Sequence, residues 1–295
     1  MKRQSTSKAR AKVESPASSR GARIQKVLAE AGVGSRRHCE TLVTEGHVRI
    51  NGRLVKDLPA FVDPLADRIE VDGRTIGKAP RHGGQKLYIA LHKPKQVIST
   101  TRDPQGRRCV TDLIEPVAQR ARLYPVGRLD AQSTGLILLT NDGFLANGLT
   151  HPRYEVAKRY EVTVRGRLLE EDLQRLRKGL FLASPARSQL AEPKRTAVES
   201  VRLLGHQADR TRGNLTQLLV TLTEGQNREI RRLLARLGYK VRRLHRTAIG
   251  PLTIKGLAAG QWRMLRTAEV HRLKKTAGMG ATAKVAKKQS VKKHR

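Results

Sequence analysis

The stretch from Arg122 to Gly143 reads RLYPVGRLDAQSTGLILLTNDG and decides how the larger part of the chain is interpreted. Its apolar run LILL stands between two glycine-containing turns, which is typical of a buried strand. A carboxylate, Asp130, precedes this strand and lies between Arg128 and Ser133. A loop at the end of a core strand can hold a reactive side chain rigidly and leave it open to a substrate. Asp130 is therefore a candidate functional residue, and the alternative is a turn aspartate paired with Arg128.

Positive charge dominates the composition. The 295 residues include 60 Lys and Arg against 25 Asp and Glu, a formal net charge of +35. Such an excess is self-repulsive in a folded chain unless a polyanion is the usual neighbour, so nucleic acid is the expected partner. A membrane is not expected as a partner, because no apolar run approaches the roughly 18 residues of a membrane span. No basic amphipathic helix carries Trp or Phe on its apolar face either.

Familiar catalytic patterns are missing from the chain. It has no Walker loop, no H-E-x-x-H and no G-x-S-x-G motif. Two cysteines, Cys39 and Cys109, lie far apart and predict neither a disulfide framework nor a zinc site, which suits the reducing cytoplasm as the location. Metal-dependent hydrolysis, phosphoryl transfer and redox chemistry are disfavoured. A reaction without metal or cofactor, or no reaction at all, is left.

The composition changes along the chain and predicts two domains with basic ends. Residues 1–22 and 271–295 are basic, low-complexity stretches that we expect to be disordered tails. The second tail contains no acidic or aromatic residue, and we expect it to hold RNA phosphates loosely. Residues 78–86 are rich in glycine and polar residues and predict a linker. Residues 23–77 predict a small domain, and residues 87–270 a larger one.

The small domain has the pattern of two helices followed by a hairpin. Apolar residues from Ile24 to Ala31 recur at helical spacing, and Ser35 can cap a second helix that ends at Gly46. Two alternating runs then flank Asn51-Gly52, a strong signal for a hairpin turn. The segment GSRRHCETLVTEGHVRINGRLV resembles the alpha-L RNA-binding domain, the fold of small-subunit ribosomal protein S-four. The alternative is a small helix–hairpin unit with a solvated basic face. The expected RNA-binding residues are Lys26, Arg36, Arg37, Arg49 and Arg53.

The larger domain predicts a sheet with helices packed on it. Alternation at Leu218, Val220 and Leu222 indicates a strand with one buried and one exposed face. The fold class is therefore α+β, with a mixed, mostly antiparallel central sheet flanked by helices. Strand-like runs are 87–92, 97–101, 136–140, 159–165, 199–204, 215–223 and 241–249, and helical runs are 143–150, 168–178 and 228–237.

Two further segments supply side chains that suit Asp130. In KRYEVTV, Tyr160 either presents its ring to a flat substrate at the start of a strand or is a core tyrosine that needs a buried partner. In EGQNREIRRLL, Asn227 can cap a helix whose apolar stripe includes Ile230. The arginines of this helix repel one another unless anions lie nearby, and those anions could be phosphates or Asp130. An arginine beside an aspartate lowers the carboxylate pKa, so that it stays ionised and can act as a nucleophile.

The motifs GRLDAQSTGLILLTNDG, KRYEVTV and EGQNREIRRLL, in this order, resemble the RsuA/RluB family of ribosomal RNA pseudouridine synthases. The resemblance covers roughly residues 22–270, and the wording NREIRR is similar to the B-type members of the family, whose substrate is the large ribosomal subunit. One departure is Lys93-Pro94-Lys95-Gln96, where the family has K-P-x-G, so that Gln replaces the usual glycine. This change leaves the geometry of that turn open.

The resemblance implies a role for each matching residue. Asp130 is the expected nucleophile towards a flipped-out uridine, Tyr160 stacks on the uracil and assists proton removal, and Arg231 pairs with the aspartate. Ile230 provides an apolar contact under the ring. The other expected substrate contacts are Asn227, Arg228 and Arg128, the last of which meets the RNA backbone or orders the flipped nucleotide.

The implied reaction agrees with the lack of cofactor motifs. Pseudouridine forms when the N1–C1′ bond of uridine breaks and the same base is reattached through C5, so no atom is gained or lost. The expected protein is a cytoplasmic, monomeric enzyme that isomerises a specific uridine in ribosomal RNA, with the large subunit as the expected source. The alternatives are a non-catalytic ribosome-associated RNA-binding protein, or a synthase for small-subunit rRNA or tRNA.

Overall fold

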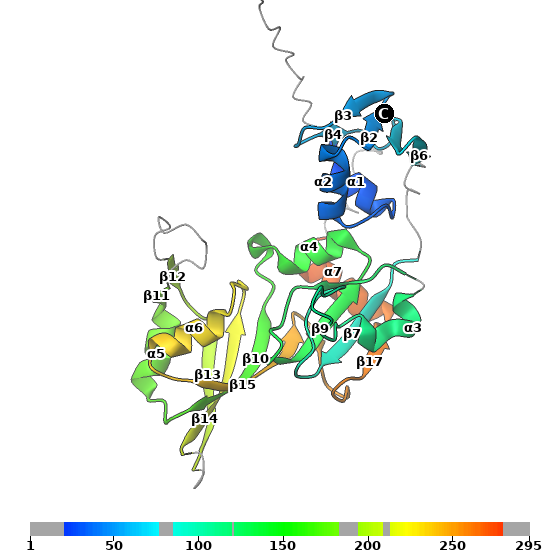
Figure 1. Cartoon of the computed structure of the whole chain (residues 1–295). Coiled ribbons are helices and arrows are strands. Elements are labelled where there is room, and N and C mark those ends of the chain that lie inside the picture. Colours follow the sequence, from blue (N-terminus) through cyan, green and yellow to red (C-terminus); the bar gives the residue numbers. More distant parts are fainter. Residues whose placement is uncertain (1–20, 77–84, 120, 183–193, 209–212, 280–295) are drawn as a thin grey trace, which may run out of the picture. The chain divides into compact units, whose positions relative to one another are not determined.

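The computed structural model describes residues 21–76, 85–119, 121–182, 194–208 and 213–279, and the chain divides into two compact units, 1–85 and 86–295 (Figure 1). Most of the predicted tails and linker, residues 1–20, 78–84 and 280–295, lies outside the described residues. No helix in the described ranges is long and apolar enough to span a bilayer.

The small unit has the two predicted helices and the predicted hairpin. The Ser35 hydroxyl accepts a hydrogen bond from the His38 N–H at 3.1 Å and so caps the second helix, as expected. Asn51 and Gly52 both have positive φ, as a tight two-residue hairpin turn requires. A four-stranded antiparallel sheet has the order β3-β2-β5-β6, and β1 pairs with β4. The elements are β1 (Ala22–Arg23), α1 (Ile24–Glu30), α2 (Arg36–Thr44), β2 (Val48–Ile50), β3 (Arg53–Val55), β4 (Phe61–Val62), β5 (Ile69–Val71) and β6 (Arg74–Ile76).

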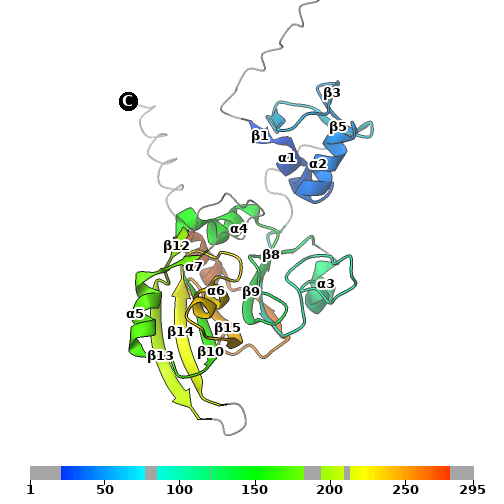
Figure 2. The same ribbon diagram turned by 60° about the vertical axis from the view of Figure 1, so that its left-hand side comes forward.

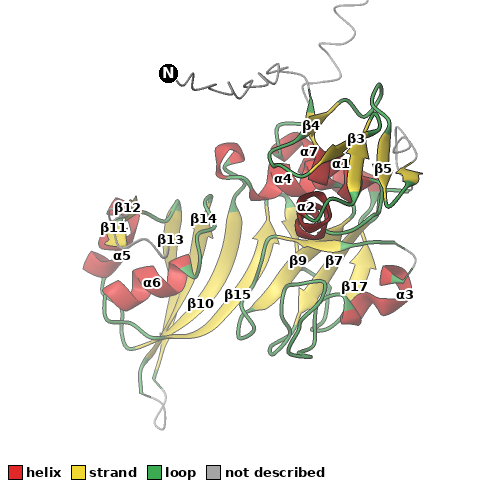
Figure 3. Ribbon diagram, turned by 45° about the horizontal axis from the view of Figure 1, so that its top comes forward, coloured by secondary structure: helices red, strands yellow, loops and turns green. Residues whose placement is uncertain are grey.

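The large unit is built on one nine-stranded sheet (Figure 3). Its strands are β7 (Tyr88–Lys93), β8 (Tyr124–Val126), β9 (Thr134–Thr140), β10 (Lys158–Arg165), β13 (Ser200–Gln207), β14 (Leu215–Leu222), β15 (Val241–Ile249), β16 (Leu252–Thr253) and β17 (Trp262–Met264). The order is β13-β14-β10-β15-β9-β7-β17, with β8 added to β9 and β16 to β15. Among the described strands only the β9–β15 pair is parallel, which confirms the predicted mixed, mostly antiparallel sheet.

Helices cover the two halves of this sheet differently (Figure 2). On β10, β13, β14 and β15 one face packs under α5 (Glu170–Lys178) and α6 (Glu229–Arg236). On β7 and β9 both faces are covered, one by α4 (Gly143–Thr150) and α7 (Thr267–Thr276), the other by η1 (Asp112–Ile114) and α3 (Glu115–Ala118). The remaining elements are η2 (Pro152–Tyr154), β11 (Leu180–Leu182) and β12 (Lys194–Thr196).

The covering of both faces explains the apolar run in β9. Leu136 and Leu138 pack towards α4 and α7, while Ile137 and Leu139 pack towards α3. All four side chains are fully buried. A strand buried on both faces carries a continuous apolar run rather than an alternating one, so the predicted buried strand is confirmed.

The strand predicted at residues 97–101 is wrong. This segment is a loop that makes a single bridge, between Ile98 and Cys109. The edges of β9 are already paired with β7 on one side and with β8 and β15 on the other, so this apolar segment finds no free edge there. Val97 is buried by packing of the loop against the α3 side of the core instead.

The predicted start of the C-terminal tail at residue 271 is also wrong. Helix α7 extends to Thr276, and the structure describes the chain to Met279. Leu273 and Ala277 are fully buried against the sheet and α4. Two apolar residues at i and i+4 lie on one face of this helix and pack it against the core, although the segment lacks acids and aromatics.

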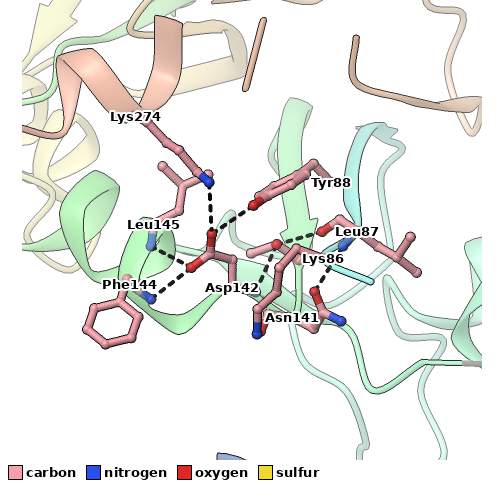
Figure 4. A network of polar contacts seen from close by, with 9 residues as sticks. Lys86, Leu87, Tyr88, Asn141, Asp142, Phe144, Leu145 and Lys274 are labelled. Atoms are coloured by element: carbon pink, nitrogen blue, oxygen red, sulfur yellow. Dashed lines mark hydrogen bonds and ion pairs between the residues drawn. The ribbon is translucent and has the colours of Figure 1, made fainter. Parts of the chain in front are cut away.

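A network around Asp142 ties α7 to the rest of the unit (Figure 4). The Asp142 carboxylate caps α4 by accepting hydrogen bonds from the N–H groups of Phe144 and Leu145, both at 3.1 Å. It also accepts a hydrogen bond from the Tyr88 hydroxyl at 2.8 Å and pairs with Lys274 of α7 at 3.7 Å. Burial and this hydrogen bond raise the pKa of Tyr88. One buried carboxylate therefore joins β7, α4 and α7.

A chain that ends after Val270 should lose much of the stability of the large unit. It lacks Leu273 and Ala277, and loss of a fully buried leucine alone costs about 3–5 kcal/mol. Urea denaturation should show this loss, whereas a chain that ends after Met279 should unfold at the wild-type midpoint. Equal midpoints for the two truncated chains would refute a structural role of α7.

Candidate active site

Asp130 lies in the loop that leads from β8 into β9, as predicted. Its side chain is 36% exposed. The Ser133 N–H donates to the Asp130 carbonyl at 3.0 Å and closes a turn. From the neighbouring segment, the Gln96 N–H donates to the Ala131 carbonyl at 2.7 Å. The carboxylate is thus open to solvent on a backbone that is held on both sides.

Ser99 fastens the residue directly before the aspartate. Its hydroxyl donates to the Leu129 carbonyl at 2.9 Å and accepts from the Leu129 N–H at 3.0 Å. Both backbone groups of Leu129 are therefore satisfied by one side chain, which fixes the direction in which the chain enters Asp130. Sequence reasoning missed this residue, because Ser99 lies 30 positions away in a segment that was predicted to be a strand.

The buried Lys93 side chain holds the neighbouring 94–97 segment and also reaches the Asp130 loop at the Ala131 carbonyl. It is fully buried, and its Nζ donates to the carbonyls of Val97 at 2.7 Å and Pro94 at 2.9 Å. Burial lowers the pKa of Lys93 to about 8, while the nearby Asp130 carboxylate acts in the opposite direction. In the sequence, this structural role of Lys93 is indicated only by its position, at the end of an apolar strand and directly before Pro94.

The turn with the unusual glutamine keeps a left-handed conformation. Gln96 has a φ of +64°, a region that glycine occupies without steric cost. Gln96 therefore adopts a conformation that favours glycine, and its N–H reaches the Ala131 carbonyl.

Two arginines of the α6 segment contact the carboxylate. Arg228 Nη1 lies 3.2 Å from Asp130 Oδ2, and Arg231 Nε lies 3.7 Å from the same oxygen. Arg231 is held further by the Val241 carbonyl at 3.2 Å and the Ser133 hydroxyl at 3.4 Å. Burial and the nearby Arg228 lower the pKa of Arg231, and Asp130 opposes this. The expected pairing of Arg231 with Asp130 is thus present in the structure, and Arg228 makes a second contact.

The structure differs from two sequence-based interpretations, the pairing of Arg128 with Asp130 and the capping of α6 by Asn227. Arg128 is exposed and forms no ion pair with Asp130 in the described part of the chain, so the simple turn pairing is absent. Asn227 is exposed and does not cap α6; the N-cap position belongs to Arg228, whose φ is +50°. Glu229 serves the helix start instead, because its carboxylate accepts the Gln226 N–H at 2.8 Å.

Tyr160 and Ile230 lie in the same apolar cluster as Leu129. Tyr160 is only 8% exposed and shares its face of β10 with Val162 and Val164, as the alternation predicted. Within the described residues the Tyr160 hydroxyl makes no hydrogen bond, and it is not among the fully buried polar atoms without a partner. The ring is thus part of the buried cluster, and its stacking on a substrate stays a prediction.

Gly135 permits the parallel contact that assembles the site. Its φ is +113°, and a Cβ atom there would lie 2.3 Å from the Arg246 carbonyl oxygen and 2.5 Å from the Arg246 nitrogen. Arg246 is nearly fully buried and donates from Nε to the Leu136 carbonyl at 2.7 Å. In register, Gly135 stands between Arg246 on β15 and Lys93 on β7.

The residues predicted to bind RNA in the small unit lie at its surface or close to it. Arg36 and Arg37 begin α2, while Arg49 and Arg53 belong to the β2–β3 hairpin, and all four are exposed. Lys26 is half-buried on α1, 3.9 Å from Glu30. Their contact with RNA stays a prediction.

This arrangement suits chemistry on a flat base within a polyanion. A rigid, half-exposed carboxylate can act as a nucleophile or base, an aromatic ring in the cluster of the preceding Leu129 can stack on a substrate, and the arginines can meet phosphates. Among the described side chains, no three His, Cys, Asp or Glu residues lie close enough together to hold a metal ion. Fold and site together define an RNA-modifying enzyme with a separate RNA-binding unit.

Comparisons with known proteins identify the family. Residues 87–236 match the RNA pseudouridylate synthase family, and residues 22–64 match the S4 domain. The chain is 39% identical to the ribosomal large subunit pseudouridine synthase B of Bacillus subtilis over 88% of this chain and 99% of that protein. It is also 39% identical to an uncharacterized RNA pseudouridine synthase of Aquifex aeolicus over 87% of this chain and 95% of that protein. A crystal structure of a pseudouridylate synthase superposes with a TM-score of 0.55 at 26% identity, covering 85% and 99% of the two chains. The chain therefore belongs to the RNA pseudouridylate synthase family and carries an S4 domain.

Replacing Gly135 with alanine should disrupt the site and the fold together. The added Cβ would overlap the backbone of β15, so we expect a loss of more than about 3 kcal/mol in the free energy of unfolding. The matched control is Gly106→Ala, where φ is +70° but no atom lies within 4 Å, and about 1–2 kcal/mol is expected. Similar losses in both variants, measured by urea denaturation, would contradict the close approach.

Proposed function

We propose that the protein converts a specific uridine of large-subunit ribosomal RNA to pseudouridine, with Asp130 as the nucleophile. The observation that carries the proposal is the contact of Asp130 Oδ2 with Arg228 at 3.2 Å and with Arg231 at 3.7 Å. Tyr160 belongs to the apolar cluster that contains Leu129, the residue before Asp130. The large-subunit target is supported by the relative from Bacillus subtilis, which is named ribosomal large subunit pseudouridine synthase B. The high positive charge supports a large RNA as substrate.

The reaction requires a rearrangement without a net change in composition. The N1–C1′ bond breaks, a C5–C1′ bond forms, C5 loses a proton and N1 gains one. Asp130 starts the reaction either by attacking C6 of the uracil or by removing the C2′ proton to give a glycal, and both routes need an ionised carboxylate at a fixed position. The contacts from Ser99, Gln96 and Lys93 supply that position.

Tyr160 and Ile230 form the platform for the flipped base. Both belong to the cluster that adjoins Leu129, next to the nucleophile. The Tyr160 ring stacks on the uracil, and its hydroxyl assists removal of the C5 proton. Flipping the base out of its stack costs a few kcal/mol, which stacking on an aromatic ring partly offsets.

The arginines have different roles because their surroundings differ. Arg231 is 15% exposed and fixed by three contacts, so it orients the carboxylate. Arg228 is 55% exposed and can exchange Asp130 for an RNA phosphate when the substrate arrives. Arg128 and Asn227 are exposed and contact the RNA near the flipped nucleotide.

The S4 unit provides the second grip on the substrate. Arg36, Arg37, Arg49 and Arg53 are exposed and meet phosphates of structured RNA, with Lys26 beside them. We also infer that the enzyme acts as a monomer in the cytoplasm. Size-exclusion chromatography with light scattering tests the monomer, and a stable dimer would overturn it.

Asp130→Asn should abolish catalysis while RNA binding remains. Tritium release from C5-labelled uridine in ribosomal RNA should fall by at least about 10³-fold, because the amide cannot serve as the nucleophile. Affinity for the same RNA should change little. The control is Glu170→Gln, which removes an exposed carboxylate on α5 and should leave turnover unchanged. An active Asp130→Asn enzyme would refute the assignment of the nucleophile.

Mapping of pseudouridines in cells with and without the gene tests the substrate. We expect one position of large-subunit rRNA to lose its pseudouridine, and the wild-type gene, but not the Asp130→Asn gene, to restore it. Loss of a pseudouridine only in small-subunit rRNA or in tRNA would contradict the large-subunit assignment.

A further inference from the structure

The half of the sheet formed by β13, β14, β10 and β15 has one face that no described helix of the large unit covers. Residues such as Tyr160 and Val162 point under α5 and α6, so Arg159 and Glu161 on the same strand point the other way. These two side chains are exposed. The helices α4 and α7 pack over β7, β9 and the end of β15 instead.

Four arginines gather on this uncovered face. The register places Arg202 on β13 opposite Leu219, which in turn lies opposite Glu161 on β10. Arg243 on β15 lies opposite Thr163, which is two residues further along β10 than Glu161. Strands two apart in a sheet are separated by about 10 Å, so these groups belong to one continuous surface. The arginines are Arg159, Arg165, Arg202 and Arg243.

The positive charges of these four arginines are not neutralised by ion pairs within the described residues. Within the described residues none of these four arginines forms an ion pair, and Glu161 is the one acid among the outward side chains of the four strands. The helix α5 differs, because Arg175 pairs with Asp172 at 3.7 Å and Arg177 with Glu170 at 3.0 Å. Unpaired like charges on one face are unfavourable unless an external anion neutralises them.

The centre of this face is hollowed and carries groups that suit a nucleic acid. A hollow of about 60 Å³ is lined by Thr163, Gln217, Leu204 and Arg243, and also by the Glu161 carboxylate, Val162 and Leu218. The carboxylate disfavours a phosphate in the hollow itself, so the phosphates are expected at the surrounding arginines. Hydroxyl, amide and guanidinium groups can bind phosphate or ribose oxygens. Leu204 is 46% exposed at an irregularity of the β13–β14 register, where it can pack against a ribose.

We propose that this face, the arginine face, binds the phosphate backbone of a second RNA segment, distinct from the one that enters the active site. The inference rests on the proposed function for the identity of the polyanion. The arginine face is the opposite side of the sheet from Tyr160, so a segment bound there cannot also present the target uridine. Arginine suits phosphate because its planar fork binds two oxygens at once.

The test is removal of charge from the full-length protein. Arg159→Gln, Arg202→Gln and Arg243→Gln are combined, and affinity for a full-length large-subunit rRNA transcript is measured across salt concentrations. Three lost phosphate contacts should weaken binding at least about tenfold near physiological salt and reduce the salt slope by about 2 to 3. Pseudouridine formation at saturating RNA should stay at the wild-type rate.

The matched control lowers the net charge equally elsewhere. Arg175→Gln, Arg177→Gln and Lys178→Gln on α5 are combined, and the salt slope should change by clearly less than in the arginine-face variant. A second variant, Glu161→Lys, adds charge to the face and should tighten binding and steepen the slope. The tighter RNA binding expected of Glu161→Lys tests the proposal even if the triple variant does not fold.

The possible outcomes separate the hypotheses. Equal effects of the two triple variants would show bulk charge and overturn the arginine face. Unchanged RNA affinity in the arginine-face variant and in Glu161→Lys would also overturn it and leave a protein partner as the alternative. Wild-type protein that binds the transcript tightly without forming pseudouridine would refute the proposed function and leave the binding result standing.

Discussion

The parallel contact between β9 and β15 is the constraint on which the rest of the catalytic unit depends. In a parallel pair the amino ends of both strands lie at the same edge of the sheet. The Asp130 loop precedes β9 and α6 precedes β15, so this one pairing brings Asp130 and Arg231 together from positions about a hundred residues apart in the chain. An antiparallel pairing would place them at opposite edges. Gly135 is the residue that lets the two backbones approach.

The site is held mainly by backbone contacts to the loop rather than by contacts to the carboxylate. Ser99 takes both polar groups of Leu129, and Gln96 and Lys93 reach Ala131. Among the described residues, the side chains that form ion pairs with the carboxylate are two arginines, one fixed and one exposed. A rigid support with a partly free reactive group is the arrangement that lets a nucleophile keep its position while its ionic partner moves to the substrate.

Patterns within one element predicted the structure well, and contacts between distant elements escaped prediction. The run LILL, the Asn51-Gly52 turn and the Ser35 cap each express a local rule, and the structure has all three. The loop at residues 97–101 depended on which strands had already filled the edges of β9. Helix α7 depended on the surface of α4, where Gly148 leaves room for Ala277. Resemblance to a family supplied Asp130, Tyr160 and Arg231 as a set, but not Ser99, which acts only through the folded backbone.

The unequal covering of the sheet also determines how readily its strands open locally and exchange their amide hydrogens with solvent. β9 is enclosed on both faces, whereas β13 lies at an edge of the sheet and has helices on one face only. Amide hydrogens of β9 therefore exchange with solvent only when the whole unit opens, and those of β13 exchange through smaller, more frequent openings. We therefore expect the amides of β13 to exchange faster than those of β9, the strand that follows the Asp130 loop. The edge that bears Arg202 can adjust to a bound polymer without disturbing it.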